Sequence, residues 1–331
     1  MMSDSSEADH HASAMRSPVP TTETRRAGSI RRTSHVDIGT QAGQLQLIGA
    51  ARDLITLDRT ADAVDAASVH ALIGDDRTLL QLHTTPTRPA AEQLIGRTVA
   101  AGFRDAVRDA LPDDVATGTS LALLLDDLPV AALISGYALL YSGSLESSDG
   151  IENKHDICSG WRTGGTMLTS VHHGNGVPVT VGPRAPELSG DDPLGWHEMA
   201  PMQMGWMRRR RLVDIALADI SLAITAMFRD SHVGPDGIET VLHEYSLTAS
   251  VDQATGAFTS CAAVPRVLPF VECPVAAASA DRMVGTHVDD VRQFVRADLR
   301  GVSTCTHLND LLRSLGDIGT LAATLNTRLR G

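Results

Sequence analysis

The sequence predicts an α+β fold made of two pseudo-symmetric copies of a small antiparallel sheet, each with helices packed on one face. Two observations lead to this prediction. Many short blocks of residues recur along the chain in the same order and at a nearly constant offset. Within each half, stretches with the two-residue alternation of a strand come before stretches with the spacing of an amphipathic helix. Strands followed by helices are typical of an α+β domain.

The predicted duplication depends on the order of the recurring blocks. Arg31-Arg32 recurs as Arg208-Arg209, which lies 177 residues later (208 − 31), and the same offset carries Arg52-Asp53 onto Arg229-Asp230. A single match of this kind is expected by chance, but an ordered series predicts two copies of one domain. The other matches need short gaps only: Val36–Ile38 with Val213–Ile215, His70 with His243, Gly96 with Gly285, and Leu121, Leu124, Leu125 and Leu128 with Leu308, Leu311, Leu312 and Leu315.

The first copy is predicted to span residues 28–141. It follows residues 1–27, which are rich in Ser, Thr, Ala and Pro without periodicity and are therefore predicted to be a disordered tail. Alternating stretches predict a strand at 44–55 and a strand pair between 69 and 83. Helices are expected at about 89–95, 101–111 and 120–128.

The second copy, residues 207–331, shows the same succession. Alternation predicts a strand at 219–233 and a strand pair at 242–263, which Asp252–Gly256 interrupts as a hairpin turn. Helices are expected at about 274–284, 287–299 and 306–315. The last of these carries leucines at i, i+3, i+4 and i+7, a spacing that predicts one buried stripe: Leu308, Leu311, Leu312 and Leu315.

A segment of different character, residues 142–206, joins the copies. It is rich in Gly, Ser, His and Asp and poor in aliphatic periodicity, and a long irregular stretch inside a compact protein is usually functional or disordered. Because it holds all three tryptophans, Trp161, Trp196 and Trp206, and disordered linkers are poor in aromatic residues, it is predicted to be an ordered active-site lid.

Composition excludes some partners. The chain has 28 Lys and Arg against 40 Asp and Glu, a net charge of −12, which disfavours nucleic acid and anionic membranes. The run Arg208–Arg211 is the exception and predicts a solvated edge, a set of carboxylate partners or an anion site. No apolar run approaches the ~20 residues of a membrane span, and no signal peptide is recognised. Four cysteines without disulfide spacing predict reduced thiols and a cytoplasmic protein, with a homo-oligomer left open.

One group of reactive residues lies in the second copy: Cys273, Cys305, His307 and His243. Cys305 precedes a predicted helix, whose N-terminus would lower the pKa of its thiol. Thiolates with imidazoles suit zinc or iron, so these residues are candidate metal ligands, and a thiol and imidazole acid–base pair is a further alternative. Equally, the cysteines could be buried core residues. The first copy has Gly118 in place of Cys305 and could not perform the same chemistry.

A second group lies in the joining segment. General acid–base catalysis needs a His or carboxylate beside a partner that tunes its pKa, and this segment supplies several of each. The competing interpretation is a solvated polar loop. Dinucleotide, phosphate-loop and serine-hydrolase motifs are absent from the sequence, so no organic cofactor is expected. The candidate catalytic residues are Asp149, Glu152, His155, Asp156, His172 and His197.

Two resemblances follow from the second copy. Glu272-Cys273-Pro274 and Cys305–Leu312, together with the Arg-rich start, resemble the domain-of-unknown-function family 2889 over about residues 207–325; the family label implies no activity. The order of strands, helices and cysteines is also distantly similar to the NifU-type iron–sulfur scaffold fold. That resemblance implies Cys273, Cys305 and His243 as ligands, whereas its first cysteine falls near Val241.

These observations lead to one expected function and three alternatives. The expectation is a cofactor-independent acid–base enzyme, a hydratase or dehydratase acting on a small, mostly apolar molecule between the two copies. His155 or His172 would be acid or base, a carboxylate of the joining segment its partner, and the Cys305 and His307 region the opposite wall. The first alternative, a hydrolase, would use the same groups. The second is a metal-binding or iron–sulfur scaffold-like protein, and the third is a plain interaction module.

Overall fold

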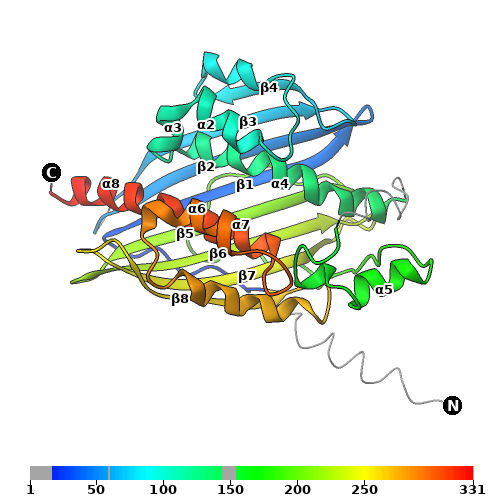
Figure 1. Cartoon of the computed structure of the whole chain (residues 1–331). Coiled ribbons are helices and arrows are strands. Elements are labelled where there is room, and N and C mark those ends of the chain that lie inside the picture. Colours follow the sequence, from blue (N-terminus) through cyan, green and yellow to red (C-terminus); the bar gives the residue numbers. More distant parts are fainter. Residues whose placement is uncertain (1–16, 59, 144–153, 331) are drawn as a thin grey trace.

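The strands of the protein form one continuous sheet. The computed structural model describes residues 17–58, 60–143 and 154–330, and in this part of the chain an eight-stranded antiparallel sheet has the order β4-β3-β2-β1-β5-β6-β7-β8 (Figure 1). The predicted α+β class is confirmed, although the two expected sheets are joined edge to edge. The strands are β1 (Ser29–Gln41), β2 (Gln44–Thr56), β3 (Ala61–Ile73), β4 (Leu79–Thr85), β5 (Met207–Leu217), β6 (Ser221–Val233), β7 (Glu239–Asp252) and β8 (Phe258–Val267).

The two halves meet where β1 pairs with β5. Ser34 is the register partner of Arg211, and these two residues are separated by the same 177 positions as the repeated sequence blocks. Each half also carries a β-bulge at an equivalent place, after Asp53 in β2 and after Asp230 in β6. These matching registers support the duplication inferred from sequence. The duplication and its domain boundaries remain predictions.

The helices cover one face of this sheet (Figure 1). The predicted leucine stripe is confirmed, because three leucines of α7 (Thr306–Ser314) and Leu315, which follows it as the C-cap, are all fully buried in the core of the second half. The predicted helices agree with the structure within a few residues, except that α4 is much longer and α8 was not predicted. The helical elements on this face are η1 (Pro89–Leu94), α2 (Phe103–Ala110), α3 (Pro112–Ala116), α4 (Ser120–Tyr141), η3 (Cys273–Met283), η4 (Val288–Asp290), α6 (Val291–Asp298), α7 (Thr306–Ser314), η5 (Leu315–Asp317) and α8 (Ile318–Arg330).

Arginines lie at the centre of the sheet. The run Arg208–Arg211 belongs to β5, so the expectation of a solvated edge is wrong and that of carboxylate partners is correct: Arg208 pairs with Asp37, Arg209 with Asp230 and Asp310, Arg210 with Glu239, and Arg211 with Asp127. Both faces of β1 and β5 are buried, so neither strand shows the alternation of a half-exposed strand. Buried charges persist in such places only when they are paired.

Helix α4 differs from the sequence expectation in one further way. Its 22 residues make it long and apolar enough to cross a membrane, with a mean hydropathy of 1.6 over an 18-residue window, so the expectation that no such run exists is wrong. Half of that window is buried inside the fold. The helix packs on β1, β2 and β3, and its Asp126 and Asp127 form ion pairs with Arg313 and Arg211. In this structure α4 is therefore a core helix.

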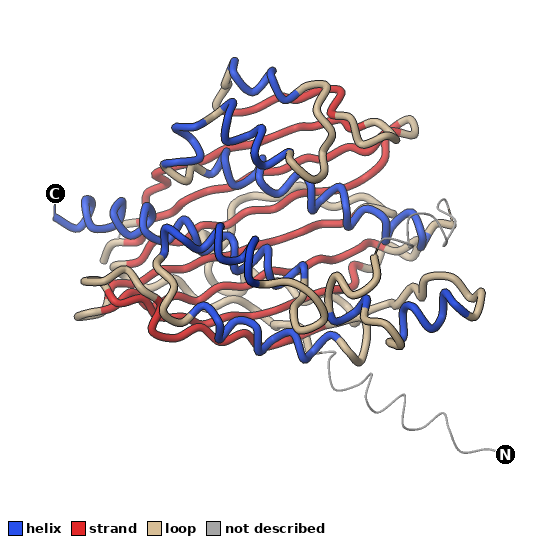
Figure 2. Tube along the Cα trace, viewed as in Figure 1, coloured by secondary structure: helices blue, strands red, loops and turns tan. Residues whose placement is uncertain are grey.

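Irregular segments cover the opposite face of the sheet (Figure 2). Residues 17–27 bind there, with Thr22 N donating to Leu188 O at 3.0 Å and Arg25 pairing with Asp192 at 2.8 Å. The prediction of a disordered tail is therefore wrong for residues 17–27, while residues 1–16 lie outside the described part. Trp196 and Leu188 pack there against Leu212 and Met227. The joining segment also contains η2 (Ser159–Trp161) and α5 (Thr166–His172).

Candidate functional site

A cavity of about 240 Å³ lies between the two halves and the joining segment. One wall is the C-terminal part of α4, another is formed by joining-segment residues between 154 and 180, and the third is formed by β7 and the N-termini of η3 and α7. Most of its surface is apolar, with aromatic rings from Tyr137, Trp161 and Phe270. Its reactive side chains are Lys154, Cys158, His243, Cys273, Cys305 and His307.

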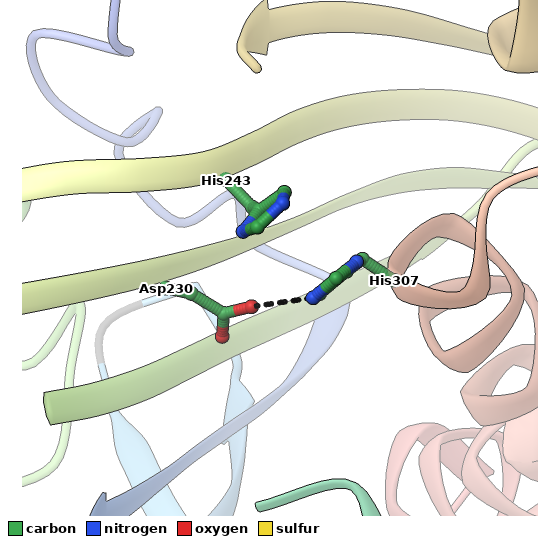
Figure 3. Close-up of side chains that lie close together, drawn as sticks. All are labelled: Asp230, His243 and His307. Carbon is green, nitrogen blue, oxygen red and sulfur yellow. Dashed lines mark ion pairs between the residues drawn. The ribbon is translucent and has the colours of Figure 1, made fainter. Parts of the chain in front are cut away.

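Two histidines that line this cavity, His243 and His307, lie beside the buried Asp230 (Figure 3). Asp230 of β6 lies directly opposite His243 of β7 in the sheet, and His307 projects from the first turn of α7. The imidazole rings of His243 and His307 are stacked, with centroids 3.8 Å apart and an angle of 13° between their planes. His307 Nε2 lies 3.8 Å from Asp230 Oδ2.

The charge states of these three groups follow from burial and from Arg209. Burial raises the pKa of the Asp230 carboxyl, but Arg209, whose Nε and Nη2 donate to its two oxygens at 2.7 and 2.9 Å, more than compensates, so the net pKa is lowered. Burial also lowers the pKa of His307, and lowers that of His243 well below its usual value. The arrangement is therefore a charged carboxylate beside two neutral imidazoles, which are able to accept a proton.

The thiols at the cavity are not activated. Cys305 precedes α7 as expected, yet burial raises the pKa of its thiol to about 12, so the predicted lowering is wrong. A full burial penalty on the thiolate exceeds what a helix N-terminus contributes. Burial likewise raises the pKa of Cys273 and Cys158. Cys305 Sγ lies 3.9 Å from His307 Nδ1. All four cysteines are buried and free.

The fold brings only some of the predicted metal ligands close enough to share one ion. Among the described residues, the group whose possible ligand atoms all lie within 4.8 Å of one another consists of Asp230, His243 and His307. Cys273 and Cys305 line the same cavity but are not members of that group. The sequence analysis did not include Asp230 among the candidate ligands. Its recurrence in the repeated Arg229-Asp230 block was the sequence signal that could have identified it.

The catalytic candidates of the joining segment lie elsewhere. Asp149 and Glu152 are outside the described residues. His155, Asp156 and His172 are exposed, and none of these three lines the cavity. The rings of His155 and His172 are neighbours, with centroids 6.0 Å apart. Asp156 accepts hydrogen bonds from the backbone and hydroxyl of Thr163, which lower its pKa.

His197 is buried on the face of the sheet opposite the cavity. Its Nδ1 lies 2.8 Å from Thr33 Oγ1, and its Nε2 lies 2.6 Å from His35 Nδ1. Successive residues of a strand point to opposite faces. Since Arg32 of β1 binds Asp317 on the helical face, Thr33 and His35 point away from the helices. His197 is therefore separated from His243 and His307 by the sheet.

Among the described residues of the first half, no histidine pair lies beside the aspartate that corresponds to Asp230. Arg32 donates two hydrogen bonds of 2.6 Å to the carboxylate of Asp53, as Arg209 donates two to Asp230. The residue opposite Asp53 is Asp65, which accepts a hydrogen bond from the backbone N of Ser120 at 2.7 Å. The register thus equates His243 with Asp65, so the sequence match of His70 to His243 is wrong. In this half the aspartate caps α4 instead of forming a histidine site.

Comparison with known proteins finds a family match for one part of the chain. Residues 207–320 match the model of a family described as a protein of unknown function, DUF2889. This match confirms the corresponding resemblance seen in the sequence and includes Asp230, His243 and His307. No curated protein and no solved structure matches the chain.

Proposed function

Because the family model that matches residues 207–320 carries no known function, we propose a function from the cavity itself: an enzyme that adds water to, or eliminates it from, a small and mostly apolar molecule. The observation that carries the proposal is the contact of His307 with Asp230, 3.8 Å apart, beside an apolar cavity. His307 accepts or supplies the proton, and His243 stacks against it.

The electrostatics of the site suit this role. A neutral imidazole accepts a proton from the substrate or from water, and the adjacent carboxylate of Asp230 stabilises the imidazolium that forms. Arg209 keeps Asp230 ionised and fixed in position. The apolar walls bind the body of the substrate and leave a few polar groups to orient it. A hydrolase would need the same groups and is the alternative within this class.

Isotope incorporation tests the assignment. A panel of small apolar enals, enones, alkenes and their hydroxy counterparts is incubated with the protein in oxygen-18 water, and label in the hydroxyl group of the hydrated product, as distinct from the exchangeable carbonyl oxygen, is measured by mass spectrometry. His307→Gln is expected to lower turnover at least ~10²-fold, the usual contribution of a general acid or base. His83→Gln, which changes an exposed histidine of β4 in the same way, serves as the matched control. Loss of turnover in His155→Ala or His172→Ala but not in His307→Gln would refute the proposal and favour the joining segment.

A second candidate function is metal binding, because two imidazoles and a carboxylate lie within 4.8 Å of one another. This donor set suits zinc or iron, although the Arg209 guanidinium already occupies both oxygens of Asp230 and its charge opposes a cation. In this interpretation Asp230 replaces the cysteines as a ligand. A site of this kind would make the chain a metalloenzyme or a metal-handling protein.

Elemental analysis of protein purified under reducing, anaerobic conditions decides between the candidate ligands. One zinc or iron per chain that is lost in His243→Ala and His307→Ala but kept in Cys273→Ser and Cys305→Ser supports the Asp230 site. Loss in the cysteine variants alone supports the set suggested by sequence. Metal-free protein in every sample removes this second candidate.

We further propose a cytoplasmic protein that uses no organic cofactor and has no nucleic-acid or membrane partner, in keeping with its net charge of −12. A homo-oligomer is compatible with this proposal. Sedimentation of the purified protein measures the oligomeric state, and titration with duplex DNA or anionic vesicles at low salt should give no binding.

A further inference from the structure

Lys154 is the only lysine in the chain. All other members of the 28 Lys and Arg residues are arginines. Lysine and arginine are not interchangeable: a guanidinium stays protonated in proteins and is the better partner for carboxylates, whereas an amine can lose its proton and act as a nucleophile. A single lysine in a protein that otherwise uses arginine is therefore a chemical exception whose position matters.

That position is the wall of the cavity. Lys154 is partly buried and lines the same space as His243 and His307. Its Nζ lies 5.4 Å from the centre of the Trp161 ring. Among the residues that the structure describes, no carboxylate forms an ion pair with it, whereas most of the arginines named above have one or two. The amine thus faces an aromatic surface and the mostly apolar cavity.

Burial and a nearby cation shift the amine of Lys154 toward its neutral form. Burial lowers the pKa of Lys154, and the positive charge of Arg77 lowers it further. Arg77 itself is held in place, because its Nη1 donates to the backbone oxygen of Ala132 in α4 at 2.5 Å. Desolvation in an apolar site and a nearby cation are the two ways in which proteins activate a lysine for attack on a carbonyl carbon.

We propose that Lys154 forms an imine with an aldehyde or ketone bound in the cavity, so that the ligand is a carbonyl compound with an apolar body. The amine attacks the carbonyl carbon and a C–N bond forms; the carbinolamine then loses its oxygen as water to leave the C=N bond. This inference rests on the proposed function and deepens it. In an imine of a β-hydroxy carbonyl compound, a base removes the α proton, the electron pair forms the new double bond, and the β-hydroxyl leaves as water after protonation.

The complementary groups lie in the same cavity. His307 is the candidate base for the α proton and, once it carries that proton, the acid for the leaving hydroxyl, while the ring of His243 stacks against it. Hydrolysis of the conjugated imine returns Lys154 and releases the unsaturated carbonyl product. The reverse sequence adds water. Atoms and electrons balance without an oxidant or reductant.

Reductive trapping tests the imine directly. The full-length protein is incubated with trans-cinnamaldehyde and sodium cyanoborohydride near neutral pH, followed by intact-mass measurement and peptide mapping. One adduct per chain on the peptide that carries Lys154 is expected, and it should be absent in Lys154→Arg and Lys154→Met. Because the chain has one lysine, its only competitor is the terminal α-amine, which maps to a different peptide.

A cavity-blocking variant shows whether the cavity directs the reaction. Gly136 of α4 lines the cavity, and a Cβ placed on it would meet no atom within 4 Å, so Gly136→Phe would fill the space and leave Lys154 unchanged. Trapping at Lys154 should fall at least tenfold in this variant. Equal labelling of the wild type and Gly136→Phe, or no adduct at Lys154, would overturn the proposal.

The two proposals can fail separately. An adduct at Lys154 without oxygen-18 in the hydroxyl group of any hydrated product would keep the imine and reject hydration, because imine formation and hydrolysis label only the carbonyl oxygen. Oxygen-18 turnover that persists in Lys154→Met, with no trapped adduct in the wild type, would keep hydration by His307 and reject the imine.

Discussion

Two buried histidines on the face away from the cavity predict that the protein loses stability in mild acid. His35 and His197 stack with ring centroids 4.9 Å apart and share a short hydrogen bond, so one ring nitrogen donates and the other accepts. Burial, together with nearby charges, lowers the pKa of each to about 3. For His35 the charges that contribute to this value are those of Arg208 and Arg210.

The charged groups around His197 also lower its pKa, with one exception. His35, Arg52 and Arg208 lower the pKa of His197, and Asp37 raises it. Asp37 is 4.0 Å from His35 Nε2 but is already paired with Arg208. Protonation of both rings would place two donors against each other. The folded protein therefore keeps the pair neutral, whereas the unfolded chain protonates each ring near pH 6.5.

The sign and size of the effect follow from proton linkage. Between pH 6.5 and pH 3 the unfolded state binds more protons than the folded state, so stability falls as the pH falls. Each group changes the free energy of unfolding by at most about 1.4 kcal/mol per pH unit. From pH 6.5, where the unfolded ring is half protonated, to pH 5 the loss is about 1.6 kcal/mol per histidine and about 3 kcal/mol for the pair.

Urea unfolding at pH 7.5, 6.5 and 5.0, followed by tryptophan fluorescence, measures this loss. The double variant His35→Gln/His197→Gln should be less stable than the wild type at pH 7.5 but should lose about 3 kcal/mol less between pH 6.5 and pH 5. The exposed-histidine variant His83→Gln should keep the wild-type slope. If the double variant and the wild type lose stability in parallel, the histidines are protonated in the folded state and the reasoning is wrong.

Three further predictions concern stability. Arg229 and Glu244 form an ion pair with no exposed side-chain surface, so Glu244→Gln should cost about 3–5 kcal/mol in urea unfolding, and a loss below about 1 kcal/mol would mean that water reaches the pair. Gly136 lies in the interior of α4 with open space around it, so Gly136→Ala should raise the free energy of unfolding by about 0.5–1 kcal/mol; a decrease would show that the helix is distorted there. A Cβ on Gly39 would lie 2.0 Å from the Trp206 ring, so Gly39→Ala should lower the melting temperature and change tryptophan fluorescence, and an unchanged emission spectrum would contradict this packing.

Hydrophobic periodicity along the chain correctly predicted most of the amphipathic helices and the half-exposed strands. The leucines of α7 follow the helical period and are buried, and β2 and β6 were recognised from alternation. The central strands β1 and β5 were missed, because arginines and aspartates occupy buried positions in them. Their charges are satisfied by partners far away in sequence, which no local period reveals.

For the candidate site too, the sequence determined some features and the tertiary structure determined others. The sequence by itself determined that the reactive side chains of the second half include His243, His307 and two cysteines, and that one lysine stands among many arginines. Only the tertiary structure decided which of them meet. The register of β6 and β7 places Asp230 opposite His243, the packing of α7 brings His307 to both, and the joining segment carries Lys154 to the same cavity. Burial then sets the charge states, because desolvation depends on everything packed around a group and not on its neighbours along the chain.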